Sequence, residues 1–163
     1  MKVHLHIKRE RNMMIITFCG HSEFKYSKEL EQQMLDILEK EVGDDPAEMY
    51  LGGYGDFDAF AYQCCKKYKE LHPNIKLIFV TPYLTPEYQR NHLSELSKSY
   101  DLILYPELED KIPRFAIVYR NRYMVDAADL VIALVAHSFG GAYKTLKYAQ
   151  KKGKRILNIA LIY

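Results

Sequence analysis

Apolar residues along this chain fall into short continuous runs and longer stretches with helical spacing, and the two kinds of segment alternate. The short runs are rich in β-branched residues and are bounded by glycine, proline or polar residues. This pattern is typical of strands that are buried on both faces of a parallel sheet. It predicts strands at residues 13–19, 48–51, 75–81, 101–105, 130–135 and 155–159.

The longer stretches predict amphipathic helices between these strands. Ser27 is a suitable N-cap for the first helix, which Gly43 ends. Asp56 is predicted to cap the second helix, and Thr85-Pro86 is predicted to start the third. Two more helices are predicted at residues 113–127 and 140–152.

Strands that alternate with helices throughout a chain favour a parallel sheet with helices on both faces, joined by right-handed crossovers. We therefore predict an α/β fold, a single Rossmann-like three-layer domain with a mainly parallel sheet flanked by helices, over residues 13–163. Residues 1–12 are predicted to be a basic lead-in or an extra strand, in which Val3, Leu5 and Ile7 alternate with other residues.

The net charge of +2 is unevenly distributed. Residues 1–12 hold four basic residues and one acidic residue, so they carry +3 and the rest of the chain carries −1. A near-neutral body lacks the basic footprint of a nucleic-acid-binding protein, and we do not expect a nucleic-acid partner. No apolar run approaches the roughly 20 residues of a membrane helix, and the N-terminus has no apolar signal segment. We expect a cytoplasmic protein without a membrane partner.

The three cysteines form neither a disulfide framework nor a metal-ligand pattern, so no metal site is predicted. Cys64 has helical spacing with apolar neighbours, which favours a place in the core. Cys19 ends the first predicted strand and could face a site.

Two glycine-rich turns, each between a predicted strand and a predicted helix, are the strongest functional signal. They are Gly52-Gly53-Tyr54-Gly55 and Gly140-Gly141. A bare backbone lets an anion approach, and a helix N-terminus offers unpaired N–H groups, so both turns are candidate phosphate sites. Neither is a dinucleotide fingerprint or a Walker A loop. Glycines after strands also let a helix pack closely on its sheet, and this alternative stays open for either turn.

Ligands of open parallel sheets bind beyond the carboxyl ends of the strands. Four loops are expected to gather there, namely Gly20-His21-Ser22, residues 52–56, Thr81-Pro82-Tyr83 and residues 136–141. Either His21 or His137 could be a general acid or base, or a polar loop residue bonded to the backbone. His137 and Ser138 are adjacent and point to opposite sides, so they do not form a nucleophile and base pair.

Charged residues near these loops supply further candidates. Arg120 or Arg122 could clamp a phosphate, although their spacing places only one of them in a site, and a surface role is the default for either. Asp56 and Asp58 are candidate catalytic carboxylates, but the predicted helix cap is the simpler role for Asp56.

Several segments together resemble one known group of proteins, the SLOG superfamily. It contains the lysine-decarboxylase-like LOG phosphoribohydrolases, the DNA-processing DprA/Smf proteins and small YpsA-like proteins of uncertain role, and this chain is most similar to the last. The resemblance covers most of residues 13–163. It rests on TFCGHS at residues 17–22, YLGGYG at 50–55, RNRYM at 120–124, ADLVIAL at 128–134, Gly140-Gly141 with Thr145, and KRILN at 154–158.

One departure from the family pattern bears on catalysis. The resemblance implies that hydrolytic members pair an arginine, which Arg120 matches, with the glutamate that ends a P-G-G-x-G-T-x-x-E motif. Residues 146–149 contain no glutamate, and the proline is also missing. Glycosidic cleavage needs a carboxylate, so the catalytic residues are left unassigned. The candidates are Arg120, His137, Asp56 and Asp58.

We therefore predict that the protein binds or senses a nucleotide or nucleotide-derived ligand and requires no cofactor. One alternative is a LOG-like phosphoribohydrolase or N-glycosidase that acts on a nucleoside 5′-monophosphate. A second is DprA-like single-strand nucleic-acid binding. The resemblance also implies a homo-oligomer. The residues expected to bind the ligand or its phosphate are Gly20, His21, Ser22, Gly52, Gly53, Tyr54, Gly55, Arg120, Ser138, Gly140, Gly141 and Thr145.

Overall fold

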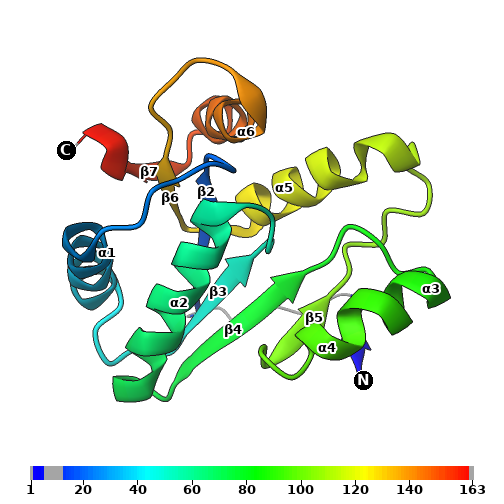
Figure 1. Ribbon diagram of the computed structural model, residues 1–163, viewed down its shortest axis with the longest axis horizontal. Coiled ribbons are helices and arrows are strands. Elements are labelled where there is room, and N and C mark those ends of the chain that lie inside the picture. The colour runs from blue at the N-terminus through cyan, green and yellow to red at the C-terminus, as the bar shows by residue number, and fades with distance from the viewer. Residues whose placement is uncertain (1, 6–12, 162–163) are drawn as a thin grey trace.

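The computed structural model describes residues 2–5 and 13–161 (Figure 1). Within these residues, seven strands form one sheet in the order β1-β5-β4-β3-β2-β6-β7, and every pair of neighbours is parallel. The strands are β1 Val3–His4, β2 Met14–Gly20, β3 Ala47–Leu51, β4 Ile75–Val80, β5 Leu102–Leu104, β6 Leu130–Leu134 and β7 Arg155–Asn158. The predicted parallel sheet is therefore confirmed.

The helices lie between the strands along the chain, as the alternating pattern predicts. They are α1 Lys28–Glu41, α2 Asp56–Leu71, α3 Pro86–Tyr88, the π-helical turn η1 Gln89–Leu93, α4 Ser94–Leu96, the 3-10 turn η2 Pro113–Phe115, α5 Ala116–Ala127, α6 Gly140–Lys151 and the 3-10 turn η3 Ile159–Leu161. No helix in the described part of the chain has the length and apolar character needed to cross a membrane.

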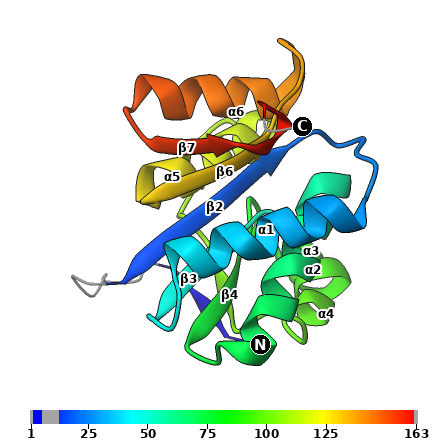
Figure 2. The same ribbon diagram turned by 90° about the vertical axis from the view of Figure 1, so that its left-hand side faces the viewer.

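Alternate residues of the central strands pack against opposite layers of helices. On β2, Ile16 and Phe18 belong to the core beneath α1 and α2, whereas Ile15 and Cys19 belong to the core beneath α5 and α6. The α3–η1–α4 segment covers the outer part of the first face, where Leu93 is buried. Figure 2 shows the resulting three layers, with α5 and α6 on the side of the sheet opposite α1 and α2. The predicted three-layer Rossmann-like domain is confirmed.

The N-terminal edge of the sheet is formed by β1. Val3 pairs with Ile103, and His4 pairs with Leu104. Ile7, which belongs to the same predicted alternation, lies outside the described residues, as do the basic residues at positions 8, 9 and 11.

Two of the three predicted helix caps form. The Ser27 hydroxyl accepts a hydrogen bond from the N–H of Leu30, and the Thr85 hydroxyl accepts one from the N–H of Tyr88. The helix predicted at residues 113–127 begins with the tighter turn η2 before it becomes α5.

The predicted cap at Asp56 is wrong. Gly55 occupies the N-cap position with φ of 89°, and Asp56 is the first residue of α2. Its N–H donates to the carbonyl of Ser22 at 2.9 Å, and its carboxylate accepts from the N–H of Phe24 at 3.2 Å. Asp56 therefore ties the loop after β2 to α2, because the positive φ of the preceding glycine turns the chain into the helix one residue earlier.

The sheet topology positions the ligand crevice. From β2 the sheet extends through β3, β4 and β5 on one side and through β6 and β7 on the other. In open parallel sheets, ligands bind at the carboxyl ends of the strands where the order reverses in this way. The loop after β2 consequently lies between the loops after β3 and β6.

Candidate functional site

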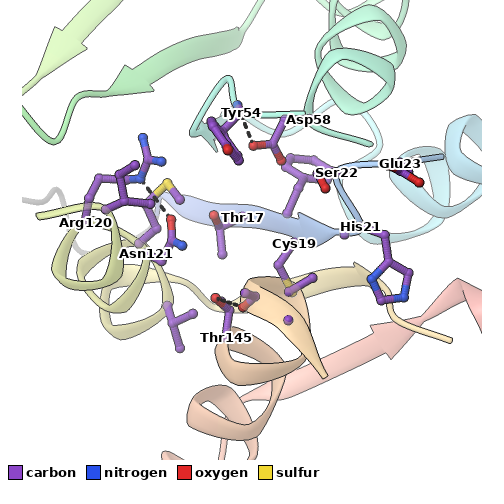
Figure 3. A pocket seen from close by; sticks show the side chains of 18 of the residues that line it. Thr17, Cys19, His21, Ser22, Glu23, Tyr54, Asp58, Arg120, Asn121 and Thr145 are labelled. Carbon is purple, nitrogen blue, oxygen red and sulfur yellow. Dashed lines mark hydrogen bonds between the residues drawn. The ribbon is translucent and has the colours of Figure 1, made fainter. Parts of the chain in front are cut away.

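A cleft of about 500 Å³ opens at the carboxyl ends of β2 and β6. Its walls come from β2 and the loop after it, the start of α2, α5, and the first turn of α6 (Figure 3). This volume is in the range of small-molecule and cofactor sites. The structure brings together ten residues predicted for the site, namely Gly20, His21, Ser22, Tyr54, Asp58, Arg120, His137, Gly140, Gly141 and Thr145.

Other predicted residues lie outside the lining of the cleft. The loop Thr81-Pro82-Tyr83 is absent from the lining, and the N–H of Thr81 continues the pairing of β4 with β5 by donating to the carbonyl of Leu104. Asp56 holds the loop after β2 rather than facing the cleft. The predicted site residues in this group are Gly52, Gly53, Gly55, Asp56 and Ser138.

Close packing accounts for the glycines of the first turn. A Cβ atom on Gly53 would lie 2.6 Å from the Phe79 ring, and one on Gly55 would lie 2.7 Å from the Cα of Ser22. Both glycines also have positive φ, 67° and 89°, which other residues rarely adopt. The first turn therefore needs glycine for its own geometry and its contacts.

The helix that follows this turn has its N-terminus occupied by acidic residues. Asp56 and Asp58 both lie in the first turn of α2. The Asp58 carboxylate accepts a hydrogen bond through Oδ2 from the N–H of Tyr54 at 2.8 Å. Negative charges already stabilise this positive end of the helix dipole, so an anionic ligand would be repelled there.

The second glycine turn, at Gly140 and Gly141, has free space beside its backbone, whereas neighbouring residues fill that space in the first turn. Among the described residues, Cβ atoms on Gly140 and Gly141 would have no neighbour within 4 Å, and both glycines line the cleft. The N-cap residue of α6, Phe139, makes no side-chain capping bond, and the first turn contains no acidic residue. The 12-residue helix α6 thus presents a bare N-terminus to the cleft.

Arg120 is the buried cation of the site, with 2% of its surface exposed. Its Nη1 donates to the carbonyls of Gly52 and Val80 at 3.0 and 2.8 Å, and its Nε donates to the side-chain oxygen of Asn121 at 2.9 Å. Nη2 donates to no residue that the structure describes. The surface role taken as the default for Arg120 is wrong, because the guanidinium ties the ends of β3 and β4 together beneath the cleft. Arg122 is exposed, so the two arginines face different ways as predicted.

Burial shifts two other titratable groups of the cleft, Asp58 and Cys19, toward their neutral forms. Burial raises the pKa of Asp58 to about 6, although the hydrogen bond from Tyr54 and the charge of Arg120 oppose the shift. Burial also raises the pKa of the Cys19 thiol to about 12, so this cysteine of the cleft is not a nucleophile near neutral pH. Of these two groups, Asp58 is therefore the one that gains or loses its charge at a pH close to neutrality.

Three aromatic rings form a stack at the α6 side of the cleft. His21 stacks on His137 with ring centroids 3.7 Å apart, and His137 stacks on Phe139 at 3.8 Å. Nε2 of His21 accepts a hydrogen bond from the N–H of Ala136 at 2.8 Å, so this nitrogen carries no proton. Partial burial and, next, the neighbouring His137 lower the pKa of His21. The sequence left two roles open for His21, a general acid or base and a polar loop residue bonded to the backbone. The hydrogen bond from Ala136 supports the second role.

Sequence reasoning missed several residues that the fold brings to the cleft. Asn121 accepts a hydrogen bond from Nε of Arg120 and so orients that side chain. Its position directly after Arg120 in the RNRYM segment could have indicated this role. Phe139, which was not predicted, is 68% exposed; with the predicted Tyr54, which is 65% exposed, it places two large rings at the rim on the loops after β6 and β3. Thr17 and Glu23 also line the cleft, and no sequence signal distinguished them.

Comparison with known structures defines the class of fold. The X-ray structure of DNA processing protein A (DprA) from Streptococcus pneumoniae matches with a TM-score of 0.61 and 17% sequence identity. The match covers 88% of this chain and 49% of the DprA chain, so this chain spans about half the length of DprA. The protein therefore has a DprA-like Rossmann fold, which agrees with the resemblance to the SLOG superfamily at the level of the fold.

Comparison of sequences adds one relative. The chain is 26% identical over 138 residues to the uncharacterized SPbeta prophage-derived protein YoqJ of Bacillus subtilis (strain 168). That match covers 75% of this chain and 81% of YoqJ. No protein-family model matches the chain. The narrower resemblance to YpsA-like proteins stays a prediction.

Proposed function

We propose that the cleft binds a nucleotide or nucleotide derivative, with a phosphate at the N-terminus of α6. The observation that carries this proposal is the combination of that bare N-terminus with the guanidinium of Arg120, whose Nη2 bonds to no described residue, in the same cleft. Unpaired N–H groups and a guanidinium both favour an oxyanion. The acidic residues at the start of α2 restrict the phosphate to the α6 side.

The rim of the cleft supports a nucleobase as the other end of the ligand. Tyr54 and Phe139 expose their rings on the two loops that flank the end of β2. Exposed aromatic rings stack on bases of any sequence. We therefore place the base at the rim and the phosphate deeper in the cleft, beside Gly141 and Arg120.

Isothermal titration calorimetry with nucleoside 5′-monophosphates and diphosphates tests this proposal. Gly141→Val should abolish binding, because its branched side chain enters the open space at the helix N-terminus. The fold should persist, since a Cβ atom there has no described neighbour within 4 Å to displace. Gln150→Val is the matched control, since it adds the same side chain to the exposed far end of α6. Equal affinity of the two variants for a nucleotide would overturn the site assignment.

A second function, cleavage of the base–ribose bond of a nucleoside 5′-monophosphate, is favoured by the environment of Asp58. A carboxyl group whose pKa is raised to about 6 can protonate a leaving base near neutral pH. Asp58 would then replace the missing glutamate of the family motif. Free base that accumulates in proton NMR spectra with the wild type, and not with Asp58→Asn, would support the enzyme; intact nucleotide after long incubation would exclude it.

Single-strand nucleic-acid binding is the third function, and it is supported by the DprA-like fold. Six basic residues and no acidic residue fall between residues 140 and 155, so basic residues are concentrated along and just after α6. A mobility-shift titration with single-stranded DNA at low salt tests this function. The homo-oligomer that the resemblance implies also stays a proposal, which light scattering on the purified protein tests.

A further inference from the structure

The proposed function puts the phosphate of the ligand on the α6 side of the cleft. The part of the ligand that contacts the opposite side, which is formed by the start of α2, is still to be identified. Gly141 follows β6 and Asp58 follows β3, and these two strands flank β2 on its two sides. Neighbouring strands are about 4.8 Å apart, so the two loops begin roughly 10 Å from each other. Since Asp58 and Gly141 line the same cleft, a sugar 5′-phosphate can form hydrogen bonds with both sides at its two ends. Figure 3 shows Asp58 and Thr145 of α6 on opposite sides of the end of β2.

The Asp58 carboxylate is prepared to accept a hydrogen bond from such a sugar. Its Oδ2 is held by the N–H of Tyr54, which fixes the side chain, whereas Oδ1 bonds to no residue that the structure describes. Asp58 lines the cleft and is half-buried. A fixed carboxylate oxygen of this kind is the usual acceptor for the hydroxyl groups of a ribose.

On the basis of the proposed function, we infer that Asp58 binds the 2′- and 3′-hydroxyls of the ligand sugar through Oδ1, so that the cleft selects ribonucleotides over deoxyribonucleotides. A hydroxyl suits this carboxyl group better than a cationic amine does. A hydroxyl can donate to the carboxylate or accept from the protonated acid, whereas an amine needs the ionised form, which burial disfavours here. A ligand without the hydroxyl leaves the desolvated oxygen unpaired, and sites of this kind discriminate strongly.

The experiment measures the affinities of one nucleoside 5′-monophosphate and its 2′-deoxy and 2′,3′-dideoxy analogues. The wild type should bind the ribonucleotide about tenfold or more tightly than the dideoxy analogue, a typical effect of losing a hydrogen bond to a charged group. Asp58→Asn should reduce this ratio to roughly a few fold, because the amide oxygen remains with Tyr54 and the amide NH2 offers the hydroxyls only a neutral hydrogen bond in place of one to a charged group. Asp56→Asn is the matched control: it removes the same charge from the same helix turn but lies outside the cleft, and it should keep the wild-type ratio.

The pH dependence of the affinity ratio gives a readout that a purely structural role would not change. The ratio should increase from pH 5.5 to 7.5 in the wild type as Asp58 ionises, and it should be flat in Asp58→Asn. The phosphate titration cancels in the ratio, since all three ligands carry the same phosphate. The other charged or titratable groups on the cleft are Glu23, Tyr54, Arg120, Cys19, His21 and His137, and they are unchanged in the variant.

The outcomes separate this inference from the proposed function. Equal binding of the ribonucleotide and the dideoxy analogue to the wild type would overturn the role of Asp58 and leave the nucleotide site intact. Full discrimination in Asp58→Asn would also overturn it and would assign the sugar to another residue. If none of the three ligands binds, the proposed function itself fails, and this inference fails with it.

Discussion

Replacing Arg120 by methionine should strongly destabilise the fold, because this arginine joins the ends of two strands. The substitution keeps a long unbranched side chain but removes the hydrogen bonds from Nη1 to the carbonyls of Gly52 and Val80. Both bonds are buried, and a hydrogen bond to a charged group contributes about 1.5–3 kcal/mol. The sum is roughly 3–6 kcal/mol before any compensation.

Two effects reduce this sum. Methionine removes a charge whose burial is itself unfavourable, as the lowered pKa of Arg120 indicates. Its apolar side chain also fills part of the vacated space. We therefore expect the free energy of unfolding to fall by about 3 kcal/mol, which corresponds to a decrease in Tm of roughly 6–12 °C for a domain of this size.

Urea denaturation followed by circular dichroism measures the change. Arg122→Met is the control, since Arg122 is exposed and lies over the rings of Tyr119 and Tyr148 at 5.9 and 5.1 Å, contacts worth about 0.5–1 kcal/mol. If Arg120→Met is less than about 1 kcal/mol more destabilising than the control, the two carbonyls do not depend on Arg120. Binding is then measured only at temperatures where each variant is folded.

Three further predictions test the packing and the electrostatics. Gly53→Ala should lower the free energy of unfolding, measured by thermal denaturation, by roughly 2–4 kcal/mol, because it adds both a steric overlap and a strained φ. Gly153→Ala is the control: it has only the positive φ and should cost about 1 kcal/mol. Equal costs would contradict the packing argument. Asn158→Leu removes two hydrogen bonds with the backbone of Val135 and should lower the free energy of unfolding by about 1–3 kcal/mol in urea, so no change would show that these bonds are replaced by water. Folding raises the pKa of Asp58 from 3.8 to about 6, so the folded state binds more protons than the unfolded state between these pH values. The free energy of unfolding of the wild type should therefore fall by up to about 3 kcal/mol as the pH rises through this window. An Asp58→Asn variant with the same pH profile as the wild type would refute the shift.

The sequence by itself determined the architecture. Apolar runs such as residues 130–135 are typical of strands that are covered on both faces, and helical spacing in the intervening segments supplies the two layers of helices. Ser27 and Thr85 were predictable as caps because a cap depends on atoms within the next three residues. Asp56 was not, because the conformation of Gly55 decided where α2 begins.

Only the tertiary structure distinguished the two glycine turns. In sequence both are glycines between a strand and a helix, and both were candidate phosphate sites. The contacts that fill the first turn come from Phe79 and Ser22, which are distant in the sequence, whereas a Cβ atom on Gly141 would meet no described residue within 4 Å. The burial of Arg120 and the raised pKa of Asp58 also arise from residues on other elements. Local sequence patterns specify hydrogen bonds and burial along one element, but steric access and electrostatic environment depend on how separate elements pack.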